Sequence, residues 1–160
     1  MLKSAALLLA LAAPLGAQSV VHPNFSGTWV LDAAKSSATG AMNAPSAGTY
    51  VVTHVGDSIS IDQKMTNNDG EQALKKTWKI DGKVWTNSLT YQGTEMTLRQ
   101  VLSWNGAVLN VHTNTDFAGT PVEQEETWTL SADGKGLTQV MNTVVNGEVY
   151  ATLTLVFTKK

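Results

Sequence analysis

Short joints of Asn, Asp and Gly divide most of this chain into runs that alternate apolar and polar side chains. Asn-Gly and Asp-Gly reach the positive φ angles that tight hairpin turns require. Because a parallel crossover needs a dozen or more residues, strands joined this closely must be antiparallel neighbours. The turn chemistry therefore predicts an up-and-down meander. The joints are Gly56-Asp57, Asn67-Asn68-Asp69-Gly70, Asp81-Gly82-Lys83, Gln92-Gly93-Thr94, Asn105-Gly106, Asp133-Gly134-Lys135 and Asn146-Gly147.

Ten segments between these joints show strand-like alternation or a bias towards β-branched and aromatic residues. Ten strands in one open sheet would leave two exposed edges, which closure into a barrel removes. We therefore predict an all-β fold, a single antiparallel up-and-down β-barrel of about ten strands. The expected strands are 27–32, 49–55, 58–65, 72–80, 84–90, 95–104, 107–115, 122–131, 136–145 and 148–158.

One connection, residues 33–48, is long and rich in Ala, Ser, Gly and Asn. Asp32 is suited to cap a short helical turn at its start, whereas Gly40 and Pro45 disfavour a longer helix. A loop of this length is typical of a lid or a binding loop. A plain surface loop is the alternative.

The N-terminus has the pattern of a secretion signal. Lys3 precedes an apolar run of Ala and Leu over residues 5–13, and small residues lead to a predicted cleavage after Ala17. The run is too short to span a bilayer, so no membrane anchor is expected. We predict a signal peptide over residues 1–17, one barrel domain over 18–160, and a secreted or periplasmic location.

Composition narrows the classes of partner. The chain has a net charge of −2, and removal of Lys3 makes it one unit more negative. This balance does not favour nucleic acid or an anionic membrane as a partner. Arg99 is the single arginine, and the chain has no cysteine. Arginine clusters and disulfides are therefore excluded, and the oligomeric state is left open.

Alternation assigns one face of each strand to the interior, because successive side chains point in opposite directions. In the last strand the interior set is apolar. Tryptophans follow the interior phase of other strands. The expected inward residues are Val149, Ala151, Leu153, Leu155 and Phe157 on the last strand, with Trp78, Trp85, Trp104 and Trp128 elsewhere.

Polar residues recur on this interior face about every thirteen positions, close to one strand plus its turn. In a meander this spacing places them at similar heights, as a polar belt around the interior. A solid apolar core would not bury such groups, so we expect a partly polar cavity with Lys76 and Glu126 as its charged members. A β-bulge would instead flip a strand and move its polar residue outside. The belt comprises Gln63, Lys76, Asn87, Gln100, Thr113, Glu126 and Gln139.

Motifs for catalysis or metal binding are missing from the sequence. His22, His54 and His112 are scattered, without a His-x-His pair, and we expect surface positions for them. There is no Gly-x-Ser-x-Gly elbow and no glycine-rich phosphate loop. Glu126 lacks a second inward carboxylate for acid–base work. No metal, cofactor or enzyme activity is predicted.

The first and last strands resemble those of a known superfamily. Phe25-Ser26-Gly27-Thr28-Trp29-Val30-Leu31 resembles the opening of fatty-acid-binding proteins, and its Gly-x-Trp matches the lipocalin signature. The C-terminal segment, Leu155-Val156-Phe157-Thr158-Lys159-Lys160, is similar to the end of a fatty-acid-binding protein. The whole resembles small secreted bacterial proteins with a lipocalin-like barrel, within the calycin superfamily. The resemblance implies that Gly27 lets the strand bend and Trp29 plugs a closed end.

The sequence departs from these families at two functional positions. Fatty-acid-binding proteins carry an Arg-x-Tyr clamp for the ligand's carboxylate, and Leu155 and Phe157 stand at the matching positions. Lipocalins lay a late-strand arginine across the opening Trp, whereas Arg99 lies mid-chain. The carboxylate chemistry of the family is therefore not expected.

We expect a carrier that binds a small, apolar or amphipathic molecule inside the barrel. A structural or interaction barrel with a filled core is the alternative, and a barrel enzyme is a weaker one. The predicted ligand-binding residues are Lys76, Trp78, Trp85, Gln100, Glu126, Trp128, Leu155 and Phe157, with Gly27 and Trp29 as the structural motif.

Overall fold

The computed structural model describes residues 21–160 except Gln92. The predicted signal peptide, residues 1–17, lies outside the described residues. The described part is built of antiparallel strands and contains no helix, so it offers no helical candidate for a membrane span.

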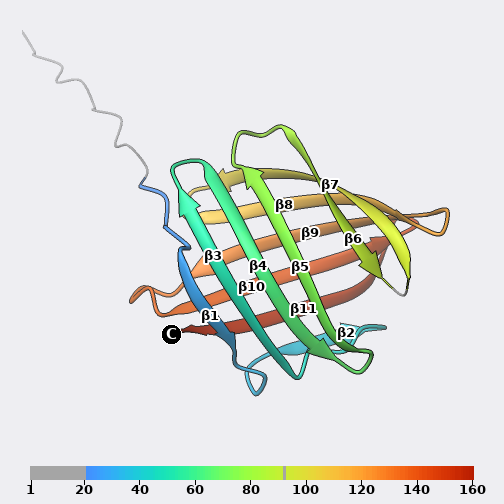
Figure 1. Cartoon of the computed structure of the whole chain (residues 1–160), viewed down its shortest axis with the longest axis horizontal. Coiled ribbons are helices and arrows are strands. Elements are labelled where there is room, and N and C mark those ends of the chain that lie inside the picture. The colour runs from blue at the N-terminus through green and yellow to red at the C-terminus, as the bar shows by residue number, and fades with distance from the viewer. Residues whose placement is uncertain (1–20, 92) are drawn as a thin grey trace, which may run out of the picture.

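Ten strands form the main ladder of a nearly closed barrel, in the order β5–β4–β3–β1–β11–β10–β9–β8–β7–β6 (Figure 1). An eleventh, β2, pairs with β11 beside this path. All the pairs are antiparallel, and consecutive strands pair from β3 to β5 and from β6 to β11. β1 joins these two runs by pairing with β3 and β11, which confirms the predicted barrel. The strands are β1 Gly27–Leu31, β2 Ser37–Gly40, β3 Ala47–Val55, β4 Ser58–Asn67, β5 Gly70–Lys79, β6 Val84–Tyr91, β7 Thr94–Asn105, β8 Val108–Phe117, β9 Thr120–Leu130, β10 Gly136–Val145 and β11 Glu148–Lys159.

The barrel has one gap in its ladder, between β5 and β6. The side chain of Asn87 on β6 bridges it. The Thr77 backbone N–H donates to Asn87 Oδ1 at 3.1 Å, and Asn87 Nδ2 donates to the Thr77 carbonyl at 3.4 Å. One amide side chain therefore takes the place of a pair of ladder hydrogen bonds.

Two local expectations differ from the structure. The connection over residues 33–48 begins with a turn in which the Asp32 carbonyl accepts the N–H of Ser36, and it then forms β2, which the sequence did not predict. Val149, expected inside, is 67% exposed. The register shifts so that Val144 pairs with Val149 although Thr143 pairs with Ala151, and this bulge reverses the side-chain phase at the start of β11.

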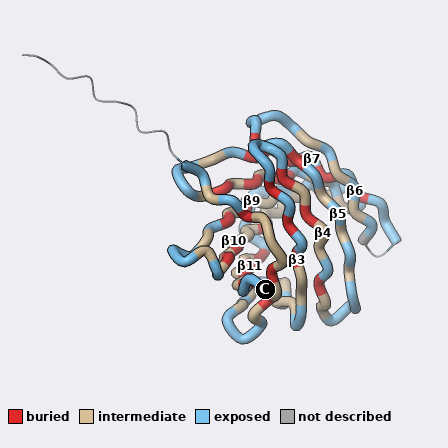
Figure 2. The backbone as a smooth tube through the Cα atoms, turned by 60° about the vertical axis from the view of Figure 1, so that its left-hand side comes forward, coloured by how far each residue is buried: buried red, intermediate tan, exposed pale blue. Residues whose placement is uncertain are grey.

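A meander places alternate hairpin turns at opposite ends of the barrel, and here the two ends differ. The β3–β4 and β7–β8 turns lie at an end closed by aromatic side chains. Trp29 is fully buried, and its Nε1–H donates to the Phe25 carbonyl at 2.8 Å. Buried and exposed residues alternate along the strands that run from this end (Figure 2).

Lys159 covers this aromatic plug. Its Nζ lies 5.1 Å from the centroid of the Trp29 ring, a cation–π arrangement. A Cβ at Gly27 would lie 2.5 Å from Lys159 Cε, and Gly27 has a φ of 144°, so the first motif position is restricted to glycine. Lys159 thus lies over the buried ring of Trp29.

Candidate ligand cavity

A cavity of about 690 Å³ opens at the end opposite the plug. Its walls come from the ends of strands at the β4–β5, β6–β7, β8–β9 and β10–β11 hairpins. This volume falls within the roughly 300–1,000 Å³ of small-molecule sites. The lining residues are Ala41, Met42, Asn43, Pro45, Tyr50, Gln63, Met65, Asn67, Gln72, Leu89, Met96, Phe117, Thr120, Val122, Gln124, Met141, Thr143, Val145, Tyr150, Leu153 and Leu155.

The segment after β2 forms part of the mouth of this cavity. Ala41, Met42, Asn43 and Pro45 line it, and the Thr143 hydroxyl donates to Met42 Sδ at 3.8 Å. The segment is positioned by β2, whose residues pair with β11 from Thr154 to Ala151. The second half of the long connection therefore borders the opening of the cavity.

A hydrogen-bonded network lies between the cavity and the plug. Trp128 Nε1–H and Gln139 Nε2–H both donate to Glu126 Oε1, the latter at 2.6 Å. The Tyr50 hydroxyl donates to Gln139 Oε1 at 2.9 Å, and Tyr50 also lines the cavity. Burial, together with the charge of Glu126, raises the pKa of Tyr50 above its ordinary range. The phenol is therefore held neutral and acts as a donor.

A second group of belt residues lies around Gln100. Trp78 Nε1–H and Asn87 Nδ2–H donate to Gln100 Oε1 at 2.9 and 3.1 Å, and Gln100 Nε2–H donates to Thr113 Oγ1 at 3.0 Å. Gln100 and Thr113 are directly paired on β7 and β8. The amide is thus satisfied at both its oxygen and its nitrogen by interior neighbours.

Lys76 is the belt's cation. Its Nζ lies 5.3 Å from the centroid of the Trp78 ring, and no carboxylate of the described residues lies within ion-pair distance of it. Burial lowers the pKa of Lys76 below its ordinary value, and the attraction of Glu126 partly opposes this. Lys76 and Glu126 therefore share the interior without forming an ion pair.

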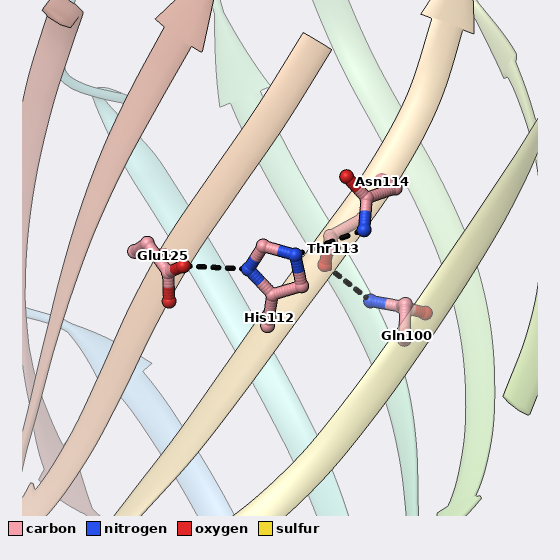
Figure 3. A network of polar contacts seen from close by, with 5 residues as sticks. All are labelled: Gln100, His112, Thr113, Asn114 and Glu125. Atoms are coloured by element: carbon pink, nitrogen blue, oxygen red, sulfur yellow. Dashed lines mark hydrogen bonds and ion pairs between the residues drawn. The ribbon is translucent and has the colours of Figure 1, made fainter. Parts of the chain in front are cut away.

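Neighbouring residues of β8 show how sharply the barrel wall separates two environments (Figure 3). Thr113 points inward to Gln100, whereas His112 and Asn114 lie on the outer face. Outside, His112 Nδ1 is 2.6 Å from Glu125 Oε1, and Asn114 Nδ2 donates to His112 Nε2 at 2.8 Å. Since the Asn114 donor requires an acceptor at Nε2, the tautomer is the one in which Nδ1–H donates to Glu125.

His54 does not take the surface position expected for the histidines. It is 6% exposed, and its Nδ1 accepts the backbone N–H of Phe25 at 3.2 Å. Its burial follows from the alternation of β3, on which Tyr50, Val52 and His54 all face inward. Within the described residues no three His, Asp or Glu side chains gather as a potential metal site.

The predicted ligand-binding residues fall into four places. Leu155 lines the cavity. Phe157 lies deeper, with its ring centroid 4.4 Å from that of Tyr50. Trp85 is partly buried near the β5–β6 gap and donates to Asp81 Oδ1 at 3.1 Å. The remaining five lie below the cavity: the belt residues Lys76, Gln100 and Glu126, and Trp78 and Trp128, which donate hydrogen bonds to Gln100 and Glu126.

Sequence reasoning missed most of the cavity wall. Gln72 and Gln124 share the inward phase of Leu74 and Glu126, so alternation carried a signal for them. Tyr150 lines the cavity because of the β11 bulge, which no local pattern revealed. Met42 reaches the mouth only because β2 docks on β11.

Comparison with known proteins supports the architecture. No protein-family model and no curated protein sequence matches the chain. Among solved structures, the chain is similar to secretory abundant heat soluble protein 4 from Ramazzottius varieornatus, with a TM-score of 0.56 and 14% sequence identity. The match covers 90% of this chain and 99% of that chain. At this identity the similarity shows the fold alone, a nearly closed antiparallel β-barrel.

Proposed function

We propose that this protein binds a small, largely apolar molecule in the cavity of a lipocalin-like barrel, as a secreted or periplasmic carrier. The observation that carries the proposal is the cavity of about 690 Å³, which the chain's own side chains leave unfilled. Its walls combine Met, Leu and Val with a few amides and hydroxyls, the mixture typical of small-molecule sites. The signal-like N-terminus supports export.

A structural barrel is the second candidate, and the belt favours it. Glu126, Gln139 and Gln100 are buried and bonded to one another or to neighbouring side chains, so the middle of the barrel is filled. A structural barrel with a filled core explains the packed middle of the barrel and its closed end. It does not explain the unfilled cavity at the open end, and for this reason we prefer the carrier function.

The binding test uses N-phenyl-1-naphthylamine, an uncharged dye whose fluorescence rises in apolar surroundings. Wild-type protein is expected to bind it saturably. Leu155→Trp fills the cavity and is expected to weaken binding at least about tenfold, because the bulk of the indole displaces the dye. Val149→Trp, on the same strand but 67% exposed, is the matched control and should bind as wild type does.

Circular dichroism verifies that both variants are folded. Absence of saturable binding by the wild type, or equal binding by the Leu155→Trp variant, would contradict the carrier. Native mass spectrometry of protein isolated from its own extracellular or periplasmic fraction complements the titration. A co-purifying mass identifies the compound class, and recovery of the full-length chain in the cytoplasm would contradict export.

A further inference from the structure

We propose that the cavity selects apolar molecules whose polar group is uncharged, such as a long-chain alcohol, ester or amide, over those with an ionised group, and that Gln63 and Gln72 bind this group. The proposal rests on the proposed function, since it concerns the ligand of the same cavity.

The first observation is the charge of the wall. None of the described residues that line the cavity is Asp, Glu, Lys, Arg or His. Transfer of an ionised carboxylate or ammonium from water into such surroundings is costly unless an opposite charge meets it. A hydroxyl or carbonyl group loses far less hydration and needs only one or two hydrogen bonds in return. The wall therefore disfavours ionised ligands.

The second observation is a pair of amides with free hydrogen-bonding capacity. Gln63 and Gln72 lie on the inward faces of β4 and β5, where Gln63 pairs with Leu74 and Gln72 with Met65, so the two are diagonal neighbours. Neither side chain hydrogen-bonds to another described residue, in contrast to Gln100. An amide offers both a donor and an acceptor, which suits a hydroxyl group.

The third observation concerns the two charged interior residues. Tyr50 lines the cavity and reaches Glu126 through Gln139, so the Glu126 carboxylate lies behind the wall and repels an anion inside the cavity. Lys76 is the interior residue that could favour an ionised ligand, because it could attract a carboxylate that penetrated past the cavity wall. It does not line the cavity, and its ammonium faces the Trp78 ring.

The test compares 1-decanol with decanoate as competitors of N-phenyl-1-naphthylamine at neutral pH. Decanol is expected to displace the dye at a concentration at least about tenfold lower than decanoate. Gln63→Leu and Gln72→Leu should each weaken decanol about three- to tenfold, the loss expected for one neutral hydrogen bond. Dye affinity is measured for each variant as well, and the loss is read as the change in the ratio of decanol to dye affinity, which separates the lost hydrogen bond from a general change of the cavity.

The Gln63→Lys variant tests whether a charge in the wall reverses the selectivity. It places a cation in the wall and should tighten decanoate while leaving decanol no tighter. The inference is overturned if wild type binds decanoate as tightly as decanol, and a loss of that binding in Lys76→Met would assign the carboxylate to Lys76. Unchanged decanol affinity in both leucine variants would also overturn it. If wild type fails to bind even the dye, the carrier function itself is wrong, and the selectivity is overturned with it.

Discussion

Glu126 is the residue on which the interior hydrogen bonding of one side of the barrel depends. It is 6% exposed, and its Oε1 accepts hydrogen bonds from Trp128 and Gln139. A buried carboxylate is costly to desolvate, and donors aimed at it offset that cost. Removing the carboxylate leaves two buried N–H groups without an acceptor, which makes Glu126 a sensitive position despite its charge.

We predict that Glu126→Leu lowers the free energy of unfolding by about 2–5 kcal/mol, because two buried donors lose their acceptor. Glu126→Gln, which keeps an acceptor oxygen, should cost clearly less. Urea denaturation followed by tryptophan fluorescence measures both. Glu125→Gln, on the exposed outer face of the same strand, is the control and should stay within about 0.5 kcal/mol of wild type. Equal losses at 125 and 126 would show that the interior network contributes nothing.

At the scale of elements, β2 is the segment whose position depends most on a close backbone approach. Gly40 has a φ of 77°, and a Cβ there would lie 2.3 Å from the Tyr150 carbonyl oxygen and 2.9 Å from Ala151 Cα. Only glycine combines this φ with this approach. Because the chain after Gly40 borders the cavity opening, a single glycine positions this segment.

We predict that Gly40→Ala detaches β2 from β11. The expected result is faster hydrogen exchange of amides in residues 37–43, with wild-type protection in the barrel strands, because the clash lies at the edge of the sheet. Gly56→Ala is the matched control: its φ is 57°, and no atom lies within 4 Å of the added Cβ, so only the backbone penalty of about 1–2 kcal/mol applies. Wild-type exchange over residues 37–43 in Gly40→Ala would contradict the proposed role of the close approach.

At the scale of the whole molecule, the barrel consists of a closed aromatic end, a polar middle and an open end. The closed end also fixes the chain before β1. Phe25 N–H donates to His54 Nδ1, and Ser26 Oγ–H donates to the His54 carbonyl at 3.0 Å. Burial lowers the pKa of His54 below its ordinary value of 6.5, and the Gly56 backbone and the nearby Asp57 only partly oppose this.

This lowered pKa predicts a pH-dependent global stability. The neutral imidazole is favoured in the folded state, so its contribution is fully present above pH 6.5 and is lost as the pH falls through the lower, folded-state pKa. We expect the free energy of unfolding, measured by urea titrations between neutral and mildly acidic pH, to fall on acidification. His54→Gln should flatten this dependence. His112→Gln should retain it, since His54 is still present; a flat profile in wild type would contradict the prediction.

The sequence alone determined the features that local chemistry and periodicity dictate. Asn-Gly and Asp-Gly joints require tight turns, so ten antiparallel strands and a barrel could be predicted. Alternation along each strand placed Gln100, Glu126 and Gln139 on the inner face, where all three are buried. Their thirteen-residue spacing predicted similar heights in the barrel, because it equals about one strand plus its turn. The expectation that Trp29 closes one end came instead from the resemblance of the Gly-x-Trp opening to a known superfamily.

Tertiary structure decided the features that depend on contacts between distant segments. The bulge in β11 turns Val149 outward and places Tyr150 at the cavity, since one unpaired residue reverses the phase of the strand end. The docking of β2 brings Met42 to the mouth across about a hundred residues of sequence. Local periodicity carries no information about either, because both arise where pairing partners, rather than neighbouring residues, fix the geometry. The opening of the cavity therefore takes its shape from these non-local contacts, whereas the polar belt follows from the repeating pattern of the chain itself.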